Sequence, residues 1–341
     1  MNIPHRRRLD WEQIGSLLAA AGIDPGHAVS CTRLTDANFN TAFRVGLDPA
    51  RSGRPSLVLK VAPAPETAIL SYEHRIMHTE AMYYRTAAGR APVPEVLHAD
   101  FTRDLIDTDF LVLSDLPGAN WHAQREHIGE PERERLRTEL GGMVAALHHM
   151  TGTGFGYPQA PLSATWRAAF LAMVDALLAD ADAFAVDLPE TTERIREIVT
   201  AAADPLDEVR TPVLVHFDLW DGNILVDRAA GRPWISGLVD GERAFWGDPL
   251  AEFVSLALFG DVETDPHLLN GYRSAGGRIE FDTGTRQRLA VYRCYLYLIM
   301  LVESVPRGLS ASGDSAHVRL VTRHLRAELD TLAKGDVSWR S

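Results

Sequence analysis

Cysteine is scarce in this chain of 341 residues. The two cysteines, Cys31 and Cys294, lie far apart and form no Cys-x-x-Cys pair. This argues against a disulfide scaffold and against a cysteine-based zinc site. Long apolar runs are lacking as well, since the longest one near the C-terminus, residues 295–302, is far too short to cross a bilayer.

The chain also lacks an excess of positive charge. It has 34 Lys and Arg against 46 Asp and Glu, a net charge of -12. Because phosphate binding needs clustered basic residues, we expect no nucleic-acid partner. The arginines at positions 6–8 are followed by acidic residues, which does not resemble a signal peptide. We therefore expect a cytoplasmic protein without a membrane partner. Its acidity would suit a cationic small molecule or could serve only solubility.

The first third of the chain predicts a sheet with one long helix. A first helix should begin after Asp10. Four or five strand-like runs separated by turn signals follow, at 28–34, 40–47, 56–62, 96–102 and 109–114. The stretch 68–88 between the third and fourth runs is helical in pattern. Together these features predict an antiparallel sheet interrupted by a single long helix.

The character of the sequence changes after residue 117. The later segments have helical periodicity, at 130–150, 163–180, 190–209, 249–259, 284–305 and 313–334. Only 213–215, 224–227 and 234–239 resemble short strands. We therefore expect an α+β fold of two lobes, residues 1–117 and a mostly helical lobe of residues 118–341, as the length also favours.

The segment 213–227 carries the strongest chemical signal. It contains His216-x-Asp218 followed, five residues after Asp218, by Asn223. This is the spacing of a kinase catalytic loop. In phosphoryl transfer an Asp accepts the proton of the attacking hydroxyl, and an Asn reaches a magnesium ion. We assign these roles to Asp218 and Asn223, and expect His216 to position the loop rather than to titrate.

A second acidic pair follows a strand-like run that ends at Val239. Asp240 stands at the end of this run, where a metal-binding carboxylate of a phosphotransferase belongs. Glu242 is two residues further and points the same way in an extended chain. Hard oxygen ligands of this kind suit Mg²⁺.

These motifs resemble the aminoglycoside phosphotransferase family, including its choline-kinase-like and fructosamine-kinase-like relatives. The resemblance rests on His216 to Asn223, on Asp240-Gly-Glu242 and on the Gly-Asp-Pro of 247–249, and it covers residues 30–260. It implies a bilobal protein-kinase-like fold, with a nucleotide-binding lobe before residue 117 and the catalytic loop and acceptor site after it. It also implies transfer of the γ-phosphoryl group of ATP or GTP, with Mg²⁺, to a hydroxyl of a small molecule.

The chain departs from the family pattern at three positions. Phe217 replaces the usual Gly, Gly241 replaces the usual Trp, and Glu252 stands where Asp is common. None of these changes removes a chemical group. We expect Phe217 to reshape the acceptor side of the catalytic loop.

The first lobe offers the remaining nucleotide contacts. Lys60 resembles the phosphate-binding lysine of a central strand, where alternation places it on one face with Val58. Its partner is Glu73 or Glu80, which lie seven residues apart on a predicted helix, and the family context favours Glu80.

Two further segments complete the expected nucleotide site. Asn38 and Asn40 sit where a phosphate-covering loop should be, and Ser114 and Leu116 match the hinge whose backbone would bind the purine edge.

Several alternatives stay open. A pseudokinase would bind nucleotide without turnover, although Lys60, Asp218, Asn223 and Asp240 are all present. A metal-dependent hydrolase would need more clustered His and Asp residues than the chain shows. The acceptor could be an aminoglycoside, another amine, a choline-like compound, an amino sugar or a sugar, so the role could be antibiotic resistance or metabolism. The enzyme could be a monomer or a homodimer. Acidic candidates for holding an amine near the mouth of the expected cleft are Glu252, Asp261, Glu263 and Asp265, with solvation of their loops as the alternative role.

Overall fold

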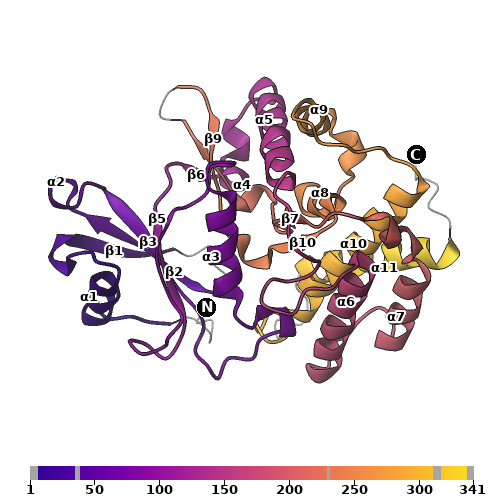
Figure 1. Cartoon of the computed structure of the whole chain (residues 1–341), viewed down its shortest axis with the longest axis horizontal. Coiled ribbons are helices and arrows are strands. Elements are labelled where there is room, and N and C mark those ends of the chain that lie inside the picture. The colour runs from indigo at the N-terminus through magenta and orange to yellow at the C-terminus, as the bar shows by residue number, and fades with distance from the viewer. Residues whose placement is uncertain (1–6, 35–38, 229–230, 310–315, 336–341) are drawn as a thin grey trace.

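The N-terminal part of the chain forms a five-stranded sheet (Figure 1). The computed structural model describes residues 7–34, 39–228, 231–309 and 316–335. The strand order is β1-β2-β3-β5-β4, and all neighbours are antiparallel. The strands are β1 (Ala28–Leu34), β2 (Thr41–Leu47), β3 (Ser56–Val61), β4 (Val96–Asp100) and β5 (Phe110–Ser114). The predicted antiparallel sheet is confirmed, with small shifts at the strand ends.

The first helix covers one face of this sheet. Helix α1 (Trp11–Ala20) begins where predicted, because the side chains of Asp10 and Gln13 form a capping box at its N-terminus. Its buried face joins the core formed with β2, β3 and β5. A short helix, α2 (Pro49–Ser52), occupies the predicted turn between β2 and β3.

Alternation along β3 directs Lys60 away from that core. Leu57, Leu59 and Val61 pack into the α1 side of the sheet, whereas Val58 and Lys60 line a cavity on the opposite side. The predicted sharing of a face by Val58 and Lys60 is therefore confirmed.

The long helix of this lobe is shorter than predicted. The expected helix spans 68–88, but α3 covers Ile76–Ala87 and a separate 3₁₀ turn covers Ser71–Glu73. Arg75 adopts a left-handed backbone with φ of 61°, which a continuous helix cannot contain. The preceding turn is held instead by the helix α6 (Trp166–Ala183), because the amide and hydroxyl of Ser71 both donate to the Asp180 carboxylate.

The rest of the chain is mostly helical, as predicted (Figure 1). Its helices are α4 (Trp121–Gln124), α5 (Glu130–His148), α6 (Trp166–Ala183), α7 (Thr192–Ala201), α8 (Glu252–Leu256), α9 (Pro266–Ser274), α10 (Thr283–Val302) and α11 (Ala316–Lys334). Two small sheets join β6 (Ala119–Asn120), β8 (Ile224–Asp227) and β9 (Trp234–Leu238), and β7 (Val213–Val215) with β10 (Phe245–Gly247). Among the described residues, no helix has the length and apolarity to cross a membrane.

The sequence interpretation missed α9 and β10. The start of α9 had a recognisable signal, since Asp265 accepts from the Leu268 amide as a cap and Pro266 is the first helical residue. Helix α9 packs closely on α5 through Gly141 and Gly271, where an added Cβ atom would overlap backbone of the facing helix. This contact fixes α9 and the loop before it beside the catalytic segment.

Candidate active site

The catalytic segment links β7 to β8 and is anchored by His216. The His216 ring is fully buried. Its Nε2 lies 2.9 Å from the Val239 carbonyl oxygen, and its Nδ1 lies 3.2 Å from the Asp218 amide that donates to it. These two contacts fix one neutral tautomer, and burial lowers the pKa of His216 to about 4. This geometry fits the expected positioning role of His216.

Asp218 and Asn223 face each other across the loop. The Asn223 amide nitrogen donates to the Asp218 carbonyl oxygen at 2.8 Å and to its carboxylate at 3.2 Å. The side-chain Oδ1 atom of Asn223, a hard ligand atom, accepts no hydrogen bond from the described residues, and Asn223 lies at the wall of a cavity. Burial raises the pKa of Asp218 to about 7, although the nearby Arg243 guanidinium acts in the opposite direction.

Phe217 does not reshape the acceptor side of the loop, so that expectation is wrong. Its backbone is left-handed, with φ of 63°, which explains why glycine is common at this position of the family pattern. Its fully buried ring packs against Phe245 and Tyr295, at centroid distances of 5.0 and 5.7 Å. It therefore contributes to the core and lines none of the cavities described below.

Glu252 anchors the catalytic loop through two backbone amides. Its carboxylate accepts from the His216 amide at 2.7 Å and from the Phe217 amide at 3.0 Å. It is fully buried, so its expected place at the cleft mouth is wrong. Burial raises the pKa of Glu252 to about 7, although the two amides act in the opposite direction.

The other acidic candidates for holding an amine already have partners. Asp261 caps a 3₁₀ turn through the Glu263 amide, and Glu263 pairs with Arg286 at 2.9 Å. Asp265 pairs with Arg137 at 2.6 Å. Of the three, Asp261 and Asp265 border a cavity beside the catalytic loop.

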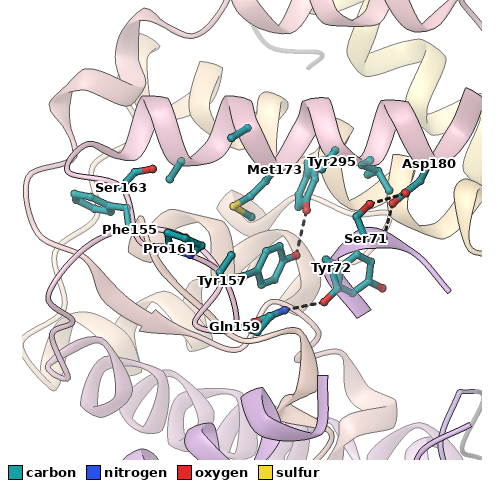
Figure 2. Close-up of a pocket in the computed structure, with 16 residues that line it drawn as sticks. Ser71, Tyr72, Phe155, Tyr157, Gln159, Pro161, Ser163, Met173, Asp180 and Tyr295 are labelled. Atoms are coloured by element: carbon teal, nitrogen blue, oxygen red, sulfur yellow. Dashed lines mark hydrogen bonds between the residues drawn. The ribbon is translucent and has the colours of Figure 1, made fainter. Parts of the chain in front are cut away.

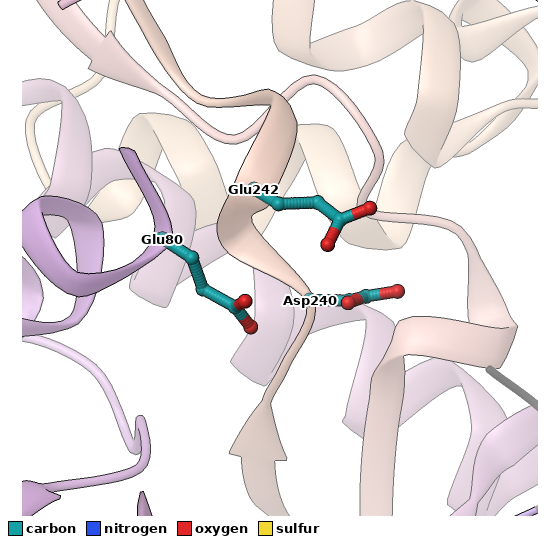
Figure 3. A group of neighbouring side chains, drawn as sticks. All are labelled: Glu80, Asp240 and Glu242. Atoms are coloured by element: carbon teal, nitrogen blue, oxygen red, sulfur yellow. The ribbon is translucent and has the colours of Figure 1, made fainter. Parts of the chain in front are cut away.

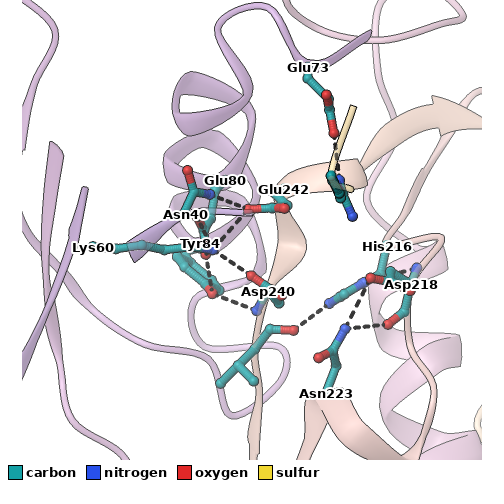
Figure 4. Close-up of polar contacts among 12 residues, drawn as sticks. Asn40, Lys60, Glu73, Glu80, Tyr84, His216, Asp218, Asn223, Asp240 and Glu242 are labelled. Atoms are coloured by element: carbon teal, nitrogen blue, oxygen red, sulfur yellow. Dashed lines mark hydrogen bonds and ion pairs between the residues drawn. The ribbon is translucent and has the colours of Figure 1, made fainter. Parts of the chain in front are cut away.

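Lys60 lies at the centre of a cluster of three carboxylates (Figure 4), and Figure 3 draws the three acids without the lysine. Its ammonium is 2.8 Å from Glu80, 2.9 Å from Glu242 and also contacts Asp240. Ligand oxygens of these three acids lie within 4.8 Å of one another. Although burial alone would lower the pKa of Lys60, the three carboxylates raise it well above its ordinary value. The lysine therefore stays charged and holds the acids together.

The cluster decides between the two candidate partners of Lys60. Glu80 also accepts from the Tyr84 hydroxyl at 2.8 Å, and that hydroxyl accepts from the Asp240 amide at 2.9 Å. Glu73 lies elsewhere and pairs with Arg307 at 2.6 Å (Figure 4). The structure therefore places Glu80, and not Glu73, beside Lys60.

The expected phosphate loop and hinge residues are only partly described. Asn38 lies outside the described residues. Asn40 is buried and donates to Glu242 at 2.5 Å. In the hinge, the Ser114 amide donates to the Glu95 carbonyl at 2.9 Å and is thus occupied. The Leu116 amide has no acceptor within the described part of the chain, and Leu116 lines the cavity at the hinge.

Three neighbouring cavities surround these residues. The hinge cavity, of about 310 Å³, is lined by Lys60, Glu80, Ser114 and Leu116 among others. The inner cavity, of about 360 Å³, is lined by Asp218, Glu242 and the C-terminal end of α10. Both cavities are lined by Asn223 and Asp240. The outer cavity, of about 780 Å³, shares four lining residues with the inner one: Trp220, Ser255, Leu258 and Phe259.

The donor set where the hinge and inner cavities meet fits a hard divalent cation. Asn223 offers a carbonyl oxygen, and Asp240 and Glu242 offer carboxylates. Burial alone would raise the pKa of Asp240, but the Lys60 ammonium outweighs it and lowers that pKa, so Asp240 is ionised. Asp240 is also held in a left-handed conformation with φ of 65°, which fixes the direction of its side chain.

A fourth cavity lies apart from these residues (Figure 2). It has about 280 Å³ and lies between α6 and the loop at 155–163. The hydroxyls of Tyr157 and Tyr295 meet at 3.1 Å, and Gln159 donates to the Tyr72 carbonyl at 2.7 Å. None of the predicted site residues lines this cavity.

Some residues of the inner cavity were missed in the sequence. Arg243 follows Glu242 directly, and its position inside the motif was a usable signal. Glu303 and Arg307 lie just after α10 and are four residues apart, which marks an ion pair but not a site. Trp220 lies within the catalytic loop itself.

The fold and this arrangement define a class of small-molecule phosphotransferases. The profile of the phosphotransferase enzyme family matches residues 30–292. The chain therefore belongs to this family and is an enzyme, a small-molecule kinase. No curated protein sequence matches it significantly.

Solved structures share the kinase-like fold at low identity. A thermostable mutant of aminoglycoside phosphotransferase APH(4)-Ia, in complex with AMP-PNP and hygromycin B, is 18% identical with a TM-score of 0.62, over 94% of this chain and 98% of that one. A gentamicin complex of APH(2")-IIa is 16% identical with a TM-score of 0.61, over 95% and 99%. A choline/ethanolamine kinase family protein from Mesorhizobium loti is 21% identical with a TM-score of 0.57, over 94% and 95%.

Proposed function

We propose that this enzyme transfers the γ-phosphoryl group of ATP or GTP to a hydroxyl of a small molecule in the inner cavity. The observation that carries the proposal is the position of Asn223 and Asp240 on the wall shared by the hinge and inner cavities. A nucleotide whose base lies at Leu116 would direct its phosphates toward Lys60 and this shared wall. Asp218 lies on the acceptor side of the same wall.

Each residue then has a definite role. Asp218 accepts the proton of the acceptor hydroxyl, and His216 and Glu252 hold its loop in place. Lys60, oriented by Glu80, binds phosphate oxygens. Asn223, Asp240 and Glu242 would hold Mg²⁺, which when bound supplies positive charge against the phosphates. The boundary between the nucleotide and acceptor lobes then lies near residue 117.

We extend the proposal to an amine-bearing acceptor. The outer cavity has five acidic residues on its wall against two arginines: Glu130, Glu134, Asp221, Asp261 and Asp265, with Arg133 and Arg137. Together with the net charge of -12, this favours an ammonium in the outer cavity. The structural neighbours that carry hygromycin B and gentamicin support the same class. Whether the role is antibiotic resistance or metabolism depends on the acceptor, and a cytoplasmic location stays a prediction.

Product analysis tests the proposal. The enzyme is incubated with Mg²⁺ and ATP or GTP in the presence of aminoglycosides, amino sugars, choline-like amines and neutral sugars. We expect a phosphorylated acceptor and nucleoside diphosphate in equal amounts. Free phosphate without phosphorylated acceptor would indicate a hydrolase, and tight nucleotide binding without turnover would indicate a pseudokinase.

A further inference from the structure

Arg243 forms part of the wall of the inner cavity opposite Asp218. It ends the 3₁₀ turn Gly241–Arg243 that follows Asp240. Its Nη2 donates to the Glu303 carboxylate at 2.7 Å. Its Nη1 lies 3.8 Å from the Asp218 Oδ1 atom, which is beyond hydrogen-bond distance. Within the described residues Nη1 donates no hydrogen bond, although Arg243 lines the cavity.

A chain of ion pairs holds Arg243 in this position. Glu303 also accepts from Arg307 at 2.9 Å, and Arg307 pairs with Glu73 at 2.6 Å. The four side chains that form these ion pairs are each at most 12% exposed, so they have little freedom to move. Glu303 accepts from Nη2 of Arg243, and Arg307 is shared between Glu303 and Glu73, so this series of ion pairs engages Arg243 through Nη2. The inner cavity therefore has a fixed cation within 4 Å of the proposed base, and Nη1 of this guanidinium donates no hydrogen bond among the described residues.

An oxygen of the acceptor can form hydrogen bonds with Arg243 and Asp218 at the same time. Because the two atoms are 3.8 Å apart, an oxygen roughly 3 Å from each lies to one side of the line that joins them and is within hydrogen-bond distance of both. A hydroxyl bound to Asp218 brings the substituent on its neighbouring carbon within reach of Nη1. A hydroxyl or carboxylate there accepts a hydrogen bond from the guanidinium, whereas an ammonium has no lone pair and cannot accept one.

We infer that Arg243 is a specificity residue. It selects acceptors in which the carbon next to the one that carries the reacting hydroxyl bears oxygen, as a hydroxyl or as a carboxylate, and disfavours an ammonium at that place. This inference rests on the proposed phosphotransfer to a hydroxyl at Asp218. It also refines the acceptor class. An ammonium, if the acceptor has one, lies at the far end of the molecule, in the outer cavity, and not beside the reacting hydroxyl.

Three acceptors that differ in one group test this preference. Propane-1,2-diol, 2-hydroxypropanoate and 1-aminopropan-2-ol share a secondary hydroxyl next to a hydroxyl, carboxylate or ammonium. We expect kcat/KM for the first two to exceed that of the amino alcohol at least tenfold. If none is turned over, their inhibition constants against the best acceptor of the panel should follow the same order. The inference is overturned if the amino alcohol has a kcat/KM equal to or higher than that of the other two compounds. It is also overturned if none of the three is turned over and none inhibits.

Two variants should move the preference in opposite directions. Arg243→Gln should bring the ratio of kcat/KM for 2-hydroxypropanoate to kcat/KM for 1-aminopropan-2-ol close to one. Glu303→Gln should increase the ratio, because Arg243 loses the carboxylate that compensates it. Glu73→Gln is the matched control, since it contacts Arg307 but not Arg243, and it should leave the ratio unchanged. If Arg243→Gln does not fold, Glu303→Gln decides, and an unchanged or lower ratio in it contradicts the inference.

These results separate the two proposals. If no acceptor of the wider panel is phosphorylated, the proposed function itself fails. If acceptors are phosphorylated but the ratio is insensitive to Arg243 and Glu303, only the specificity role fails.

Discussion

Lys60 and Glu80 form a buried ion pair in which Nζ lies 2.8 Å from Oε2. If this pair positions the lysine for phosphate, Lys60→Ala should raise the KM for nucleotide roughly 10-fold to 100-fold, because the enzyme loses one charge-assisted hydrogen bond to the nucleotide. Glu80→Gln should have a smaller effect, because it removes only the orienting charge. Steady-state kinetics at varied nucleotide concentration measures both.

Glu73→Gln is the control for that comparison. Glu73 pairs with Arg307 and lies outside the Lys60 cluster, so the KM for nucleotide should not change. The free energy of unfolding should fall by about 1–3 kcal/mol, because a buried guanidinium loses one ionised partner. A larger effect of Glu73→Gln than of Glu80→Gln on the KM for nucleotide would contradict the assignment.

Asp218→Asn should abolish turnover while nucleotide binding stays intact. The carboxylate is needed only when the acceptor hydroxyl gives up its proton, so kcat should fall at least about 100-fold. Asp221→Asn is a matched control on the same loop, and its side chain faces the outer cavity. It should change the KM for the acceptor more than kcat. An Asp218→Asn enzyme with more than a tenth of the original kcat would rule out the general-base role.

Asp240→Ala should remove the dependence of nucleotide binding on Mg²⁺. Asp240 is the ionised carboxylate on the wall shared by the hinge and inner cavities, where the metal and phosphates should meet. Calorimetric titration with ADP, with and without Mg²⁺, gives the two dissociation constants. A variant that keeps the magnesium effect of the original enzyme would place the metal elsewhere.

Glu252 should make stability depend on pH. Burial raises the pKa of Glu252 in the folded chain to about 7, above its ordinary value of 4.5. The folded state thus binds this proton more tightly, and its contribution to the free energy of unfolding is present below pH 4.5 and is lost as the pH rises through 7. The loss amounts to at most about 3 kcal/mol.

Glu252→Gln removes this titration. Relative to the original enzyme, the variant should therefore become more stable as the pH rises from 5 to 8. Urea unfolding at several pH values gives the difference. Glu130→Gln, an exposed change of the same kind, should show a constant difference. If the Glu252→Gln difference is equally constant, burial does not perturb this carboxyl as stated.

Salt should reveal a cationic acceptor. Steering by a net charge of -12 is screened beyond a Debye length of about 8 Å at physiological ionic strength. For an amine-bearing acceptor, kcat/KM should fall as salt rises while kcat changes little. A neutral sugar should show a flat response. A neutral or anionic best acceptor with a flat response would end the cationic hypothesis and leave the kinase assignment in place.

The local chemistry of the site could be predicted because its residues follow one another closely in the chain. His216, Asp218 and Asn223 belong to one loop, and Asp240 and Glu242 to one turn. Their spacing therefore encodes their geometry. Alternation in β3 placed Lys60 correctly for the same reason, since a strand has a fixed period of two residues.

Longer-range relationships could not be predicted in this way. Glu252 lies beneath the catalytic loop only because α8 packs there, and an acidic residue in sequence gives no sign of full burial. Likewise, the pairing of Arg243 with Glu303 joins positions 60 residues apart. The predicted helix at 68–88 failed at Arg75 because a contact with α6 holds the preceding turn, and such tertiary contacts override local propensity.

The Tyr83 ring lies directly against Gly241 and leaves no room for a side chain at that position. A Cβ atom on Gly241 would overlap the Tyr83 ring, which is fully buried against the turn after Asp240. The family pattern has Trp at the position of Gly241, whereas in this chain the ring that fills this space is that of Tyr83 in α3. Among relatives of this enzyme, a bulky residue at the first position should therefore accompany a small one at the second.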